Sequence, residues 1–173
     1  MTFDPKKLHW DDVKSEVHEG MDYIEHIKSK HQQIMHKSNY KAYKPKQAVI
    51  ENIKGFFESS DKSMKVLSLG ATWCKTCANV KPSLIKIVEM VDSDKFKVFL
   101  LGGVKTKMGS TDEDYSWARK SPPEFHDPKF AVDKIPLVYF FNGDGQCVAR
   151  VGKYPNGGKT YEEEILQIAQ NKL

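Results

Sequence analysis

Two short apolar runs, separated by a helical stretch, constrain the fold of this chain more than any other feature. Residues 65–71 (KVLSLGA) and 95–103 (KFKVFLLGG) have the length and character of buried strands. Between them, from about Cys74 to Val91, apolar residues recur at helical spacing. A strand, a helix and a second strand in this order predict a parallel pair joined by a right-handed crossover.

The last third of the sequence predicts an antiparallel hairpin followed by a helix. LVYFF (137–141) and QCVARVG (146–152) flank NGDG, which is a strong hairpin signal. GKTYEEEILQIAQ then closes the chain as a helix. We expect the hairpin to extend the same sheet. The result is an α/β fold with a central mixed sheet of about four to five strands flanked by helices.

The N-terminal region predicts a helical extension over residues 1–44, ahead of a domain that comprises residues 45–173. From Trp10 to Met35 apolar residues recur at intervals of three and four, which favours one long amphipathic helix of roughly seven turns. Such a helix can pack against its own chain, and the same repeat suits a coiled-coil seam in a dimer. The Lys- and Tyr-rich stretch 36–46 is typical of a solvated connector, and Pro45 opens a second helix.

Composition and charge exclude several classes of protein. The 173 residues carry a formal net charge of +4, which is too mild for a dedicated nucleic-acid binder. The N-terminal residues lack the apolar core of a secretory signal, and no run of about 18 apolar residues could span a membrane. We therefore expect a cytoplasmic protein that binds neither nucleic acid nor membrane. Three cysteines are too few for a disulfide-stapled secreted domain, so a C-x-x-C pair favours catalysis or metal binding.

Cys74 and Cys77 form the C-x-x-C pair, and redox chemistry suits them better than zinc. A structural zinc site needs four ligands. Cys147 stands far along the chain, and we expect it to be a buried, inert thiol. His18 and His26 fall two turns apart on the predicted long helix, too far for a shared ion. We therefore predict no metal site.

The position of Cys74 at the start of a helix predicts a reactive thiolate. Unpaired backbone N–H groups would point at its sulfur, and the helix dipole and the charge of Lys75 would act in the same direction. The dipole is worth only roughly 0.3–1 kcal/mol, so a thiol poised near neutral pH also needs direct hydrogen bonds. The S–H of Cys77, one turn further into the helix, is the expected donor, and Cys77 would be the shielded resolving thiol.

Four landmarks occur in this sequence in the order typical of one protein family. Trp73–Cys77 reads W-C-x-x-C, and Pro82 follows the second cysteine by five residues. DPKFAVDKIPLVYFF (127–141) contains an Ile-Pro step, and NGDGQCVARVG (142–152) is a hairpin that ends in glycine. In these landmarks the sequence resembles the thioredoxin family, over about residues 46–173.

The resemblance implies a thioredoxin-like three-layer sandwich and a role for each matched residue. Pro82 would kink the active-site helix, and Trp73 would shield the sulfurs. Ile135–Pro136 would be a cis bond beside the disulfide, with the backbone of Ile135 free to pair with an extended substrate. Gly152 would lie in the substrate groove.

The sequence also departs from the family pattern. Ser68 stands where the family has a buried aspartate that takes the proton of the resolving thiol, so Cys77 must lose its proton to water or to another group. Lys75 and Thr76 replace the usual Gly-Pro or Pro-His between the cysteines, and the added charge should stabilise the thiolate and raise the redox potential. An insertion at about residues 104–126 is longer than the family core, and such loops often select partners.

The resemblance implies an enzyme, a protein-disulfide oxidoreductase that needs no cofactor beyond the Cys74–Cys77 disulfide. Its partners would be disulfide-containing proteins and a thioredoxin-reductase-type electron donor. Two alternatives remain: a redox protein dedicated to one client, recognised through the N-terminal helix and residues 104–126, and a non-catalytic dimeric binding module. The expected state is a monomer or a weak dimer through the N-terminal helix.

Overall fold

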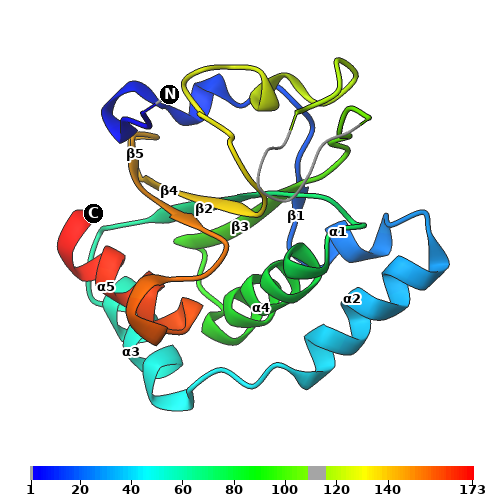
Figure 1. The fold of residues 1–173 in the computed structure, drawn as a ribbon. Helices are drawn as coiled ribbons and strands as arrows, with labels where there is room; N and C mark the ends of the chain where they lie inside the picture. Colours follow the sequence, from blue (N-terminus) through cyan, green and yellow to red (C-terminus); the bar gives the residue numbers. More distant parts are fainter. Residues whose placement is uncertain (1, 109–115) are drawn as a thin grey trace.

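Five strands form one mixed sheet at the centre of the protein (Figure 1). The structure is a computed structural model that describes residues 2–108 and 116–173. The strands are β1 (His18–Glu19), β2 (Met64–Leu69), β3 (Phe96–Leu101), β4 (Leu137–Asn142) and β5 (Cys147–Gly152). They lie in the order β1-β3-β2-β4-β5, with β2 and β3 parallel and the other pairs antiparallel. The predicted parallel pair, the hairpin and the mixed sheet are thereby confirmed.

The α-helices cover one face of the sheet (Figure 1). They are α1 (Asp22–Glu25), α2 (Lys30–Ala42), α3 (Gln47–Glu58), α4 (Lys75–Val91) and α5 (Tyr161–Lys172). The opposite face is covered by the N-terminal segment and by the described residues of the connection from β3 to β4, and both contain short 3₁₀ turns. The sheet therefore lies between a layer of helices and a layer of loops and turns.

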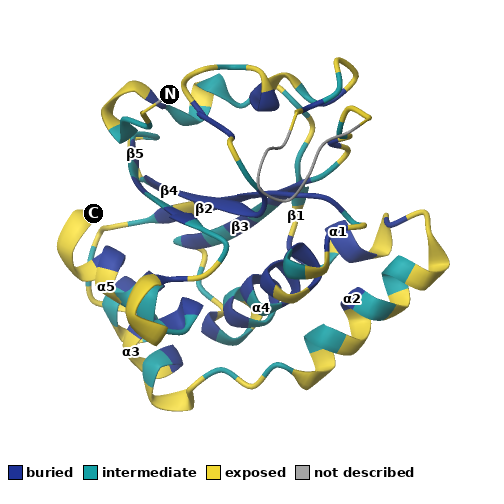
Figure 2. Cartoon of the chain, viewed as in Figure 1, coloured by how far each residue is buried: buried dark blue, intermediate teal, exposed yellow. Residues whose placement is uncertain are grey.

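Alternate side chains of the strands enter the two halves of the core. Val66 and Phe140 belong to the buried cluster beneath the helices. Leu67 and Tyr139 belong to the cluster on the opposite side. The strands β2, β3 and β4 are consequently buried along most of their length (Figure 2), which accounts for their largely apolar sequences. The thiols of the C-x-x-C pair belong to the second cluster.

Local sequence signals account for the ends of several elements. Thr160 caps α5 in a reciprocal pair with Glu163, whose N–H donates to the threonine hydroxyl while its carboxylate accepts from the Thr160 N–H. In the hairpin, the Asn142 side chain accepts from the N–H of Asp144 at 3.1 Å. Gly145 takes a φ of +87°, a conformation that glycine adopts without steric cost.

The prediction of one helix from Trp10 to Met35 is wrong, because the chain turns at Gly20. Gly20 has a φ of +56°, in the left-handed region that ends a helix. The residues before it pair with β3 as the edge strand β1, and those after it form α1 and α2. Pairing with the sheet supplies the backbone hydrogen bonds that a helix would have made, and side-chain spacing does not distinguish the two.

The residues of the alternative dimer seam do not share one helix face. Trp10 packs on Phe99 and Phe141, with ring centroids 5.1 and 5.2 Å away. Ile34, by contrast, lies on α2 and is 58% exposed. Trp10 therefore belongs to a segment that covers the sheet.

The stretch 36–46 is not simply a solvated connector, since α2 extends to Ala42. The hydroxyls of Tyr40 and Tyr43 donate to the carboxylates of Glu89 on α4 and Glu162 on α5. The Lys- and Tyr-rich composition thus belongs to a helix and a short link that are hydrogen-bonded to the helical layer.

The predicted insertion spans residues 104–126, of which 109–115 lie outside the described part of the chain. Its described residues, 104–108 and 116–126, lie on the face of the sheet opposite the helices (Figure 1). The indole N–H of Trp117 donates to the Val132 carbonyl at 2.7 Å, and its ring packs edge-on against Phe125. Both aromatic side chains are buried and pack locally.

Glu124 connects this loop to the N-terminal segment. Its buried carboxylate accepts from the N–H of Lys14 at 2.6 Å, from the N–H of Ser15 at 2.9 Å and from the Ser15 hydroxyl at 2.5 Å. Against the effect of burial, the hydrogen bonds from Ser15 and Lys14 lower the pKa of Glu124. The carboxylate therefore holds the two irregular segments together.

Candidate active site

The C-x-x-C pair lies where β2 leads into α4. Cys74 is the N-cap of α4, with extended backbone angles, and its Sγ accepts from the N–H of Cys77 at 3.2 Å. Both residues are free thiols; Cys74 is 8% exposed and Cys77 is fully buried. The predicted placement of Cys74 at the first helical turn and of Cys77 one turn further in is confirmed.

The surroundings of the two thiols separate their pKa values. The hydrogen bond from the Cys77 thiol is the largest cause that lowers the pKa of Cys74, which falls to about 7 although burial opposes it; the N–H groups of Cys77 and Thr76 also contribute. Burial and the bond to Cys74 raise the pKa of Cys77 far above its ordinary value. At neutral pH one sulfur is therefore partly ionised and the other keeps its proton.

The positive charge that lowers the pKa of Cys74 is that of Lys81, not the predicted Lys75. Lys75 lies exposed at the start of α4, where water screens its charge. Lys81 is one turn beyond Cys77 and fully buried. The sequence does carry a signal for it, since residues four apart on a helix share a face.

The ammonium group of Lys81 is held by two strands. Its Nζ donates to the carbonyls of Ser68 on β2 at 2.8 Å and Leu101 on β3 at 3.3 Å, and it lies 4.7 Å from the centroid of the Tyr23 ring. Burial lowers the pKa of Lys81 to about 8, against the attraction of the two cysteines, which raises it. The amine and the ammonium forms are thus both accessible near neutral pH.

Gly70 allows the thiol and the lysine to approach the backbone. A Cβ at this position would lie 2.8 Å from the Sγ of Cys77 and 2.8 Å from the Cε of Lys81. The Cys77 sulfur and the Lys81 side chain therefore both lie close to the Gly70 backbone, just after the end of β2. Any larger residue would have to displace one of them.

The predicted proline and groove residues lie at the same end of the sheet as the cysteine pair. Leu69 pairs with Leu137, so Pro136 continues the register beside Gly70. The Ile135–Pro136 bond is cis, as the resemblance implies. Ile135 is only 1% exposed, in the same buried cluster as both cysteines, so its backbone is covered in this structure.

Gly152, the other predicted groove residue, is also covered. It pairs with Leu137 across the hairpin. A Cβ on Gly152 would lie 2.7 Å from the Cε of Lys134. The Lys134 side chain therefore occupies the space over this glycine, and a client strand would have to displace it.

Pro82 lies inside α4 and leaves a carbonyl without its helical donor. A proline has no N–H, so it cannot bond to the carbonyl of Ala78, four residues earlier. The side-chain amide of Asn39 on α2 donates to that carbonyl at 2.8 Å. The sequence motif predicts a role for Pro82 but gives no signal for Asn39, because the two residues are far apart in the chain.

Trp73 is 43% exposed beside the pair. Its indole N–H donates to the carbonyl of Val104 at 3.3 Å, which fixes the ring against the loop after β3. The third cysteine, Cys147, lies on β5 and is buried, and burial raises the pKa of its thiol to about 11. The expectation of a buried thiol at Cys147 is confirmed.

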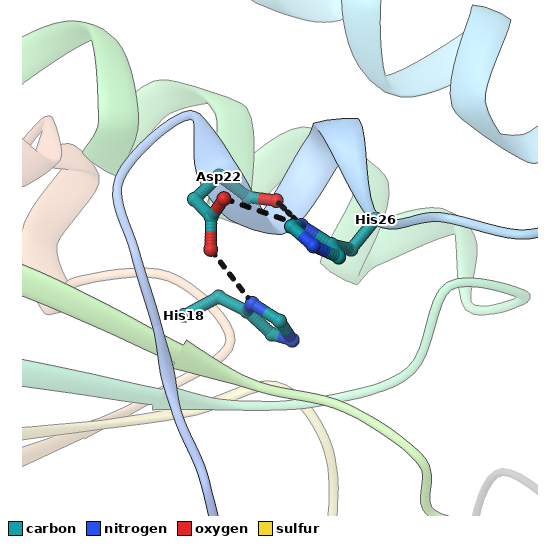
Figure 3. A group of neighbouring side chains, drawn as sticks. All are labelled: His18, Asp22 and His26. Atoms are coloured by element: carbon teal, nitrogen blue, oxygen red, sulfur yellow. Dashed lines mark hydrogen bonds and ion pairs between the residues drawn. The ribbon is translucent and has the colours of Figure 1, made fainter.

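The prediction that His18 and His26 lie too far apart to share an ion is wrong, because the two residues do not lie on one helix. The turn at Gly20 brings their rings together, stacked with centroids 4.7 Å apart (Figure 3). The Asp22 carboxylate bonds to His18 at 2.9 Å and lies 3.2 Å from His26. In the described part of the chain, these three residues form the one cluster of histidine, cysteine or acidic side chains whose ligand atoms lie close enough together to share a metal ion. Their mutual hydrogen bonds already account for the arrangement.

Comparisons with known proteins support the fold alone. No protein-family model and no curated protein matches the sequence. A protein of unknown function from Pseudomonas aeruginosa has a similar structure, with a TM-score of 0.59 and 14% identity, over 98% of this chain and 93% of that chain. An HIV epitope scaffold has a TM-score of 0.61 and 12% identity, over 94% of this chain and 90% of that one.

The fold and the site together define a mixed α/β protein with a C-x-x-C pair at a helix N-terminus. No helix in the described ranges combines the length and apolarity required to cross a membrane.

Proposed function

We propose that this protein is a thiol-disulfide oxidoreductase of the thioredoxin-like kind, with Cys74 as nucleophile and Cys77 as resolving thiol. The observation that carries the proposal is the contrast between the two sulfurs. The pKa of Cys74 is lowered to about 7 at the helix N-terminus, whereas Cys77 is buried and keeps its proton. The cis proline beside Gly70 and the exposed Trp73 support the thioredoxin-like assignment.

In the first step the Cys74 thiolate attacks one sulfur of a client disulfide. A bond forms between Cys74 and that sulfur, and the client disulfide breaks. The second client sulfur leaves as a thiolate and takes a proton from water. The helix N-terminus stabilises the attacking thiolate through the N–H groups of Cys77 and Thr76.

In the second step Cys77 loses its proton and attacks the Cys74 sulfur of the mixed disulfide. The client leaves as its second thiolate, and a Cys74–Cys77 disulfide forms. Two electrons have moved from the dithiol to the client. A thioredoxin-reductase-type donor would then return two electrons and two protons to the pair.

The covered groove favours a restricted range of clients within this function. The buried backbone of Ile135 and the Lys134 side chain over Gly152 would impede an extended chain that lacks contacts able to displace them. A protein dedicated to one client should therefore reduce a generic disulfide protein such as insulin slowly and react fast with that client.

Three cysteine variants test the proposal. Cys74→Ser should abolish disulfide reduction, because it removes the nucleophile. Cys77→Ser should accumulate mixed disulfides with clients, which non-reducing electrophoresis detects. Cys147→Ser is the matched control and should retain wild-type turnover. Turnover that persists in Cys74→Ser would refute the assignment.

A further inference from the structure

We propose that Lys81 accepts the proton of Cys77 when the mixed disulfide is resolved. This inference rests on the proposed function and assigns the group that its second step requires. Cys77 is fully buried and bears a thiol that keeps its proton at neutral pH. A buried thiol cannot pass its proton directly to bulk water, so a base inside the protein has to receive it.

The geometry of the pocket puts Lys81 next to the thiol. The Sγ of Cys77 and the Cε of Lys81 lie at the same distance, 2.8 Å, from the point where a Gly70 Cβ would be. Both residues lie on the same face of α4, four positions apart. The Nζ is anchored by the carbonyls of Ser68 and Leu101, which can hold an ammonium group after it has received a proton.

The groups around Lys81 form a small cluster of polar atoms within the apolar core. Tyr23 on α1, His36 on α2 and Ser68 on β2 each contain a buried polar atom for which no hydrogen-bond partner occurs within the described residues. The Tyr23 ring packs against Lys81 and, at 6.2 Å between centroids, against His36. Polar atoms are seldom left unpaired in a core without a functional reason. Among the described residues, the Tyr23 ring, His36 and the two cysteines are titratable groups that interact with the Lys81 amine, and Ser68 contributes its backbone carbonyl.

The charge state of Lys81 is coupled to the state of Cys74. The negative charge of the thiolate favours the ammonium form, and its attraction raises the pKa of Lys81 against the effect of burial. Once Cys74 is in a mixed disulfide that charge is gone, and burial favours the neutral amine. The base therefore becomes available at the step that needs it.

The step balances in protons and electrons. The S–H bond of Cys77 breaks, and its proton joins the free electron pair on Nζ. The Cys77 thiolate then forms a bond to the Cys74 sulfur, and the client sulfur departs with the electron pair of the mixed disulfide. Lys81 is left as an ammonium ion that donates hydrogen bonds to the backbone carbonyls of Ser68 and Leu101.

Stopped-flow reaction of the reduced protein with excess dithiobis(nitrobenzoate) measures attack by Cys74 and resolution by Cys77 as separate steps. Attack by Cys74 releases the first thionitrobenzoate, at a rate proportional to reagent concentration. Resolution by Cys77 releases the second, at a rate independent of that concentration. The first phase reports the proposed function, and the second reports the role of Lys81.

Lys81→Met keeps the length of the side chain and removes the base. We expect the second phase to slow by about 100-fold at neutral pH, as for loss of a general base. The first phase should change much less, since Lys81 affects the pKa of Cys74 only through its charge. The pH profile of the second phase should lose the inflection that the amine contributes and rise only where the thiol itself ionises.

Two further variants are needed: Lys81→Arg, which retains the charge, and Lys86→Met, which is a control. Arginine keeps the charge but stays protonated, so Lys81→Arg should not restore a fast second phase. Lys86, further along α4, is the matched control, and Lys86→Met should leave both phases unchanged. A second phase of wild-type speed in Lys81→Met or Lys81→Arg would overturn the role of Lys81 and leave the proposed function intact. A slow first phase in the wild type would refute the proposed function itself.

Discussion

The side-chain amide of Asn39 donates a 2.8 Å hydrogen bond to the carbonyl of Ala78, the group that Pro82 leaves without a helical donor. Through this hydrogen bond Asn39, which lies in the N-terminal region (residues 1–44), stabilises α4, the helix that Cys74 caps. The N-terminal region is therefore part of the support of the candidate active site.

Asn39→Ala should destabilise the protein by about 1–3 kcal/mol, because it leaves a part-buried carbonyl without a donor. In a Pro82→Ala background the new N–H can bond to Ala78, so the same change should cost less. Denaturant unfolding of the four proteins in this double-mutant cycle measures the difference. Equal costs in the two backgrounds would contradict the link between Asn39 and Pro82.

Alkylation of Cys74 by iodoacetamide should accelerate as the pH rises through about 7, because the thiolate is the reactive form. Cys147 is the internal reference: burial raises the pKa of its thiol to about 11, and it should remain unmodified. Mass spectrometry after timed quenching resolves the sites. Cys74 that reacts only at the pH of an ordinary cysteine would count against the predicted thiolate.

Gly70→Ala should destabilise the fold by about 1–3 kcal/mol, since the added Cβ would meet the Cys77 sulfur and the Lys81 side chain at 2.8 Å. Gly55 on α3 is the matched control, because a Cβ there has open space. Gly55→Ala should be neutral or stabilising, as alanine favours a helix more than glycine does. Thermal unfolding of both variants checks the contrast.

The stability difference between the wild type and Lys81→Met should depend on pH. The pKa of Lys81 is about 8 in the folded protein and 10.5 in an ordinary lysine, so the unfolded chain binds more protons between these values. The wild type should therefore gain up to about 3 kcal/mol relative to Lys81→Met as the pH rises from 8 to 10.5.

At neutral pH Lys81→Met should be the more stable protein, because it no longer buries a charge. Urea titrations at several pH values measure the free energy of unfolding of both proteins. The thiols and tyrosines that titrate in the same range are present in both proteins, so their contributions cancel in the difference. A difference that stays constant with pH would show that the buried amine does not titrate in this window.

Glu124→Gln should destabilise the protein at neutral pH by about 1–3 kcal/mol, since an amide cannot replace the carboxylate that accepts from Lys14 and Ser15. The pKa of Glu124 is lowered below its ordinary 4.5. Its contribution is thus present above pH 4.5 and is lost as the pH falls through the folded-state value.

The stability of the wild type should approach that of Glu124→Gln in acid. Glu58→Gln, at an exposed position on α3, is the control and should leave stability unchanged. An equal effect of the two substitutions at neutral pH would contradict the role of Glu124 in joining the two segments.

The sequence by itself determined the elements that depend on short-range patterns. The runs at 65–71 and 95–103 became β2 and β3, and NGDG became the hairpin turn, because periodicity and turn preferences act within a few residues. The N-cap position of Cys74 and the shielding of Cys77 follow from the same local pattern of a strand, a turn and a helix.

Only the tertiary structure decided the turn at Gly20, the burial of Lys81 and the bond from Asn39 to Ala78. An apolar spacing of three and four fits both a helix and a segment laid across a sheet, and the edge of β3 selected the second. Lys81 is buried at a place where carbonyls from two strands, those of Ser68 and Leu101, receive its ammonium group. These outcomes depend on contacts between distant segments, which local propensity does not encode.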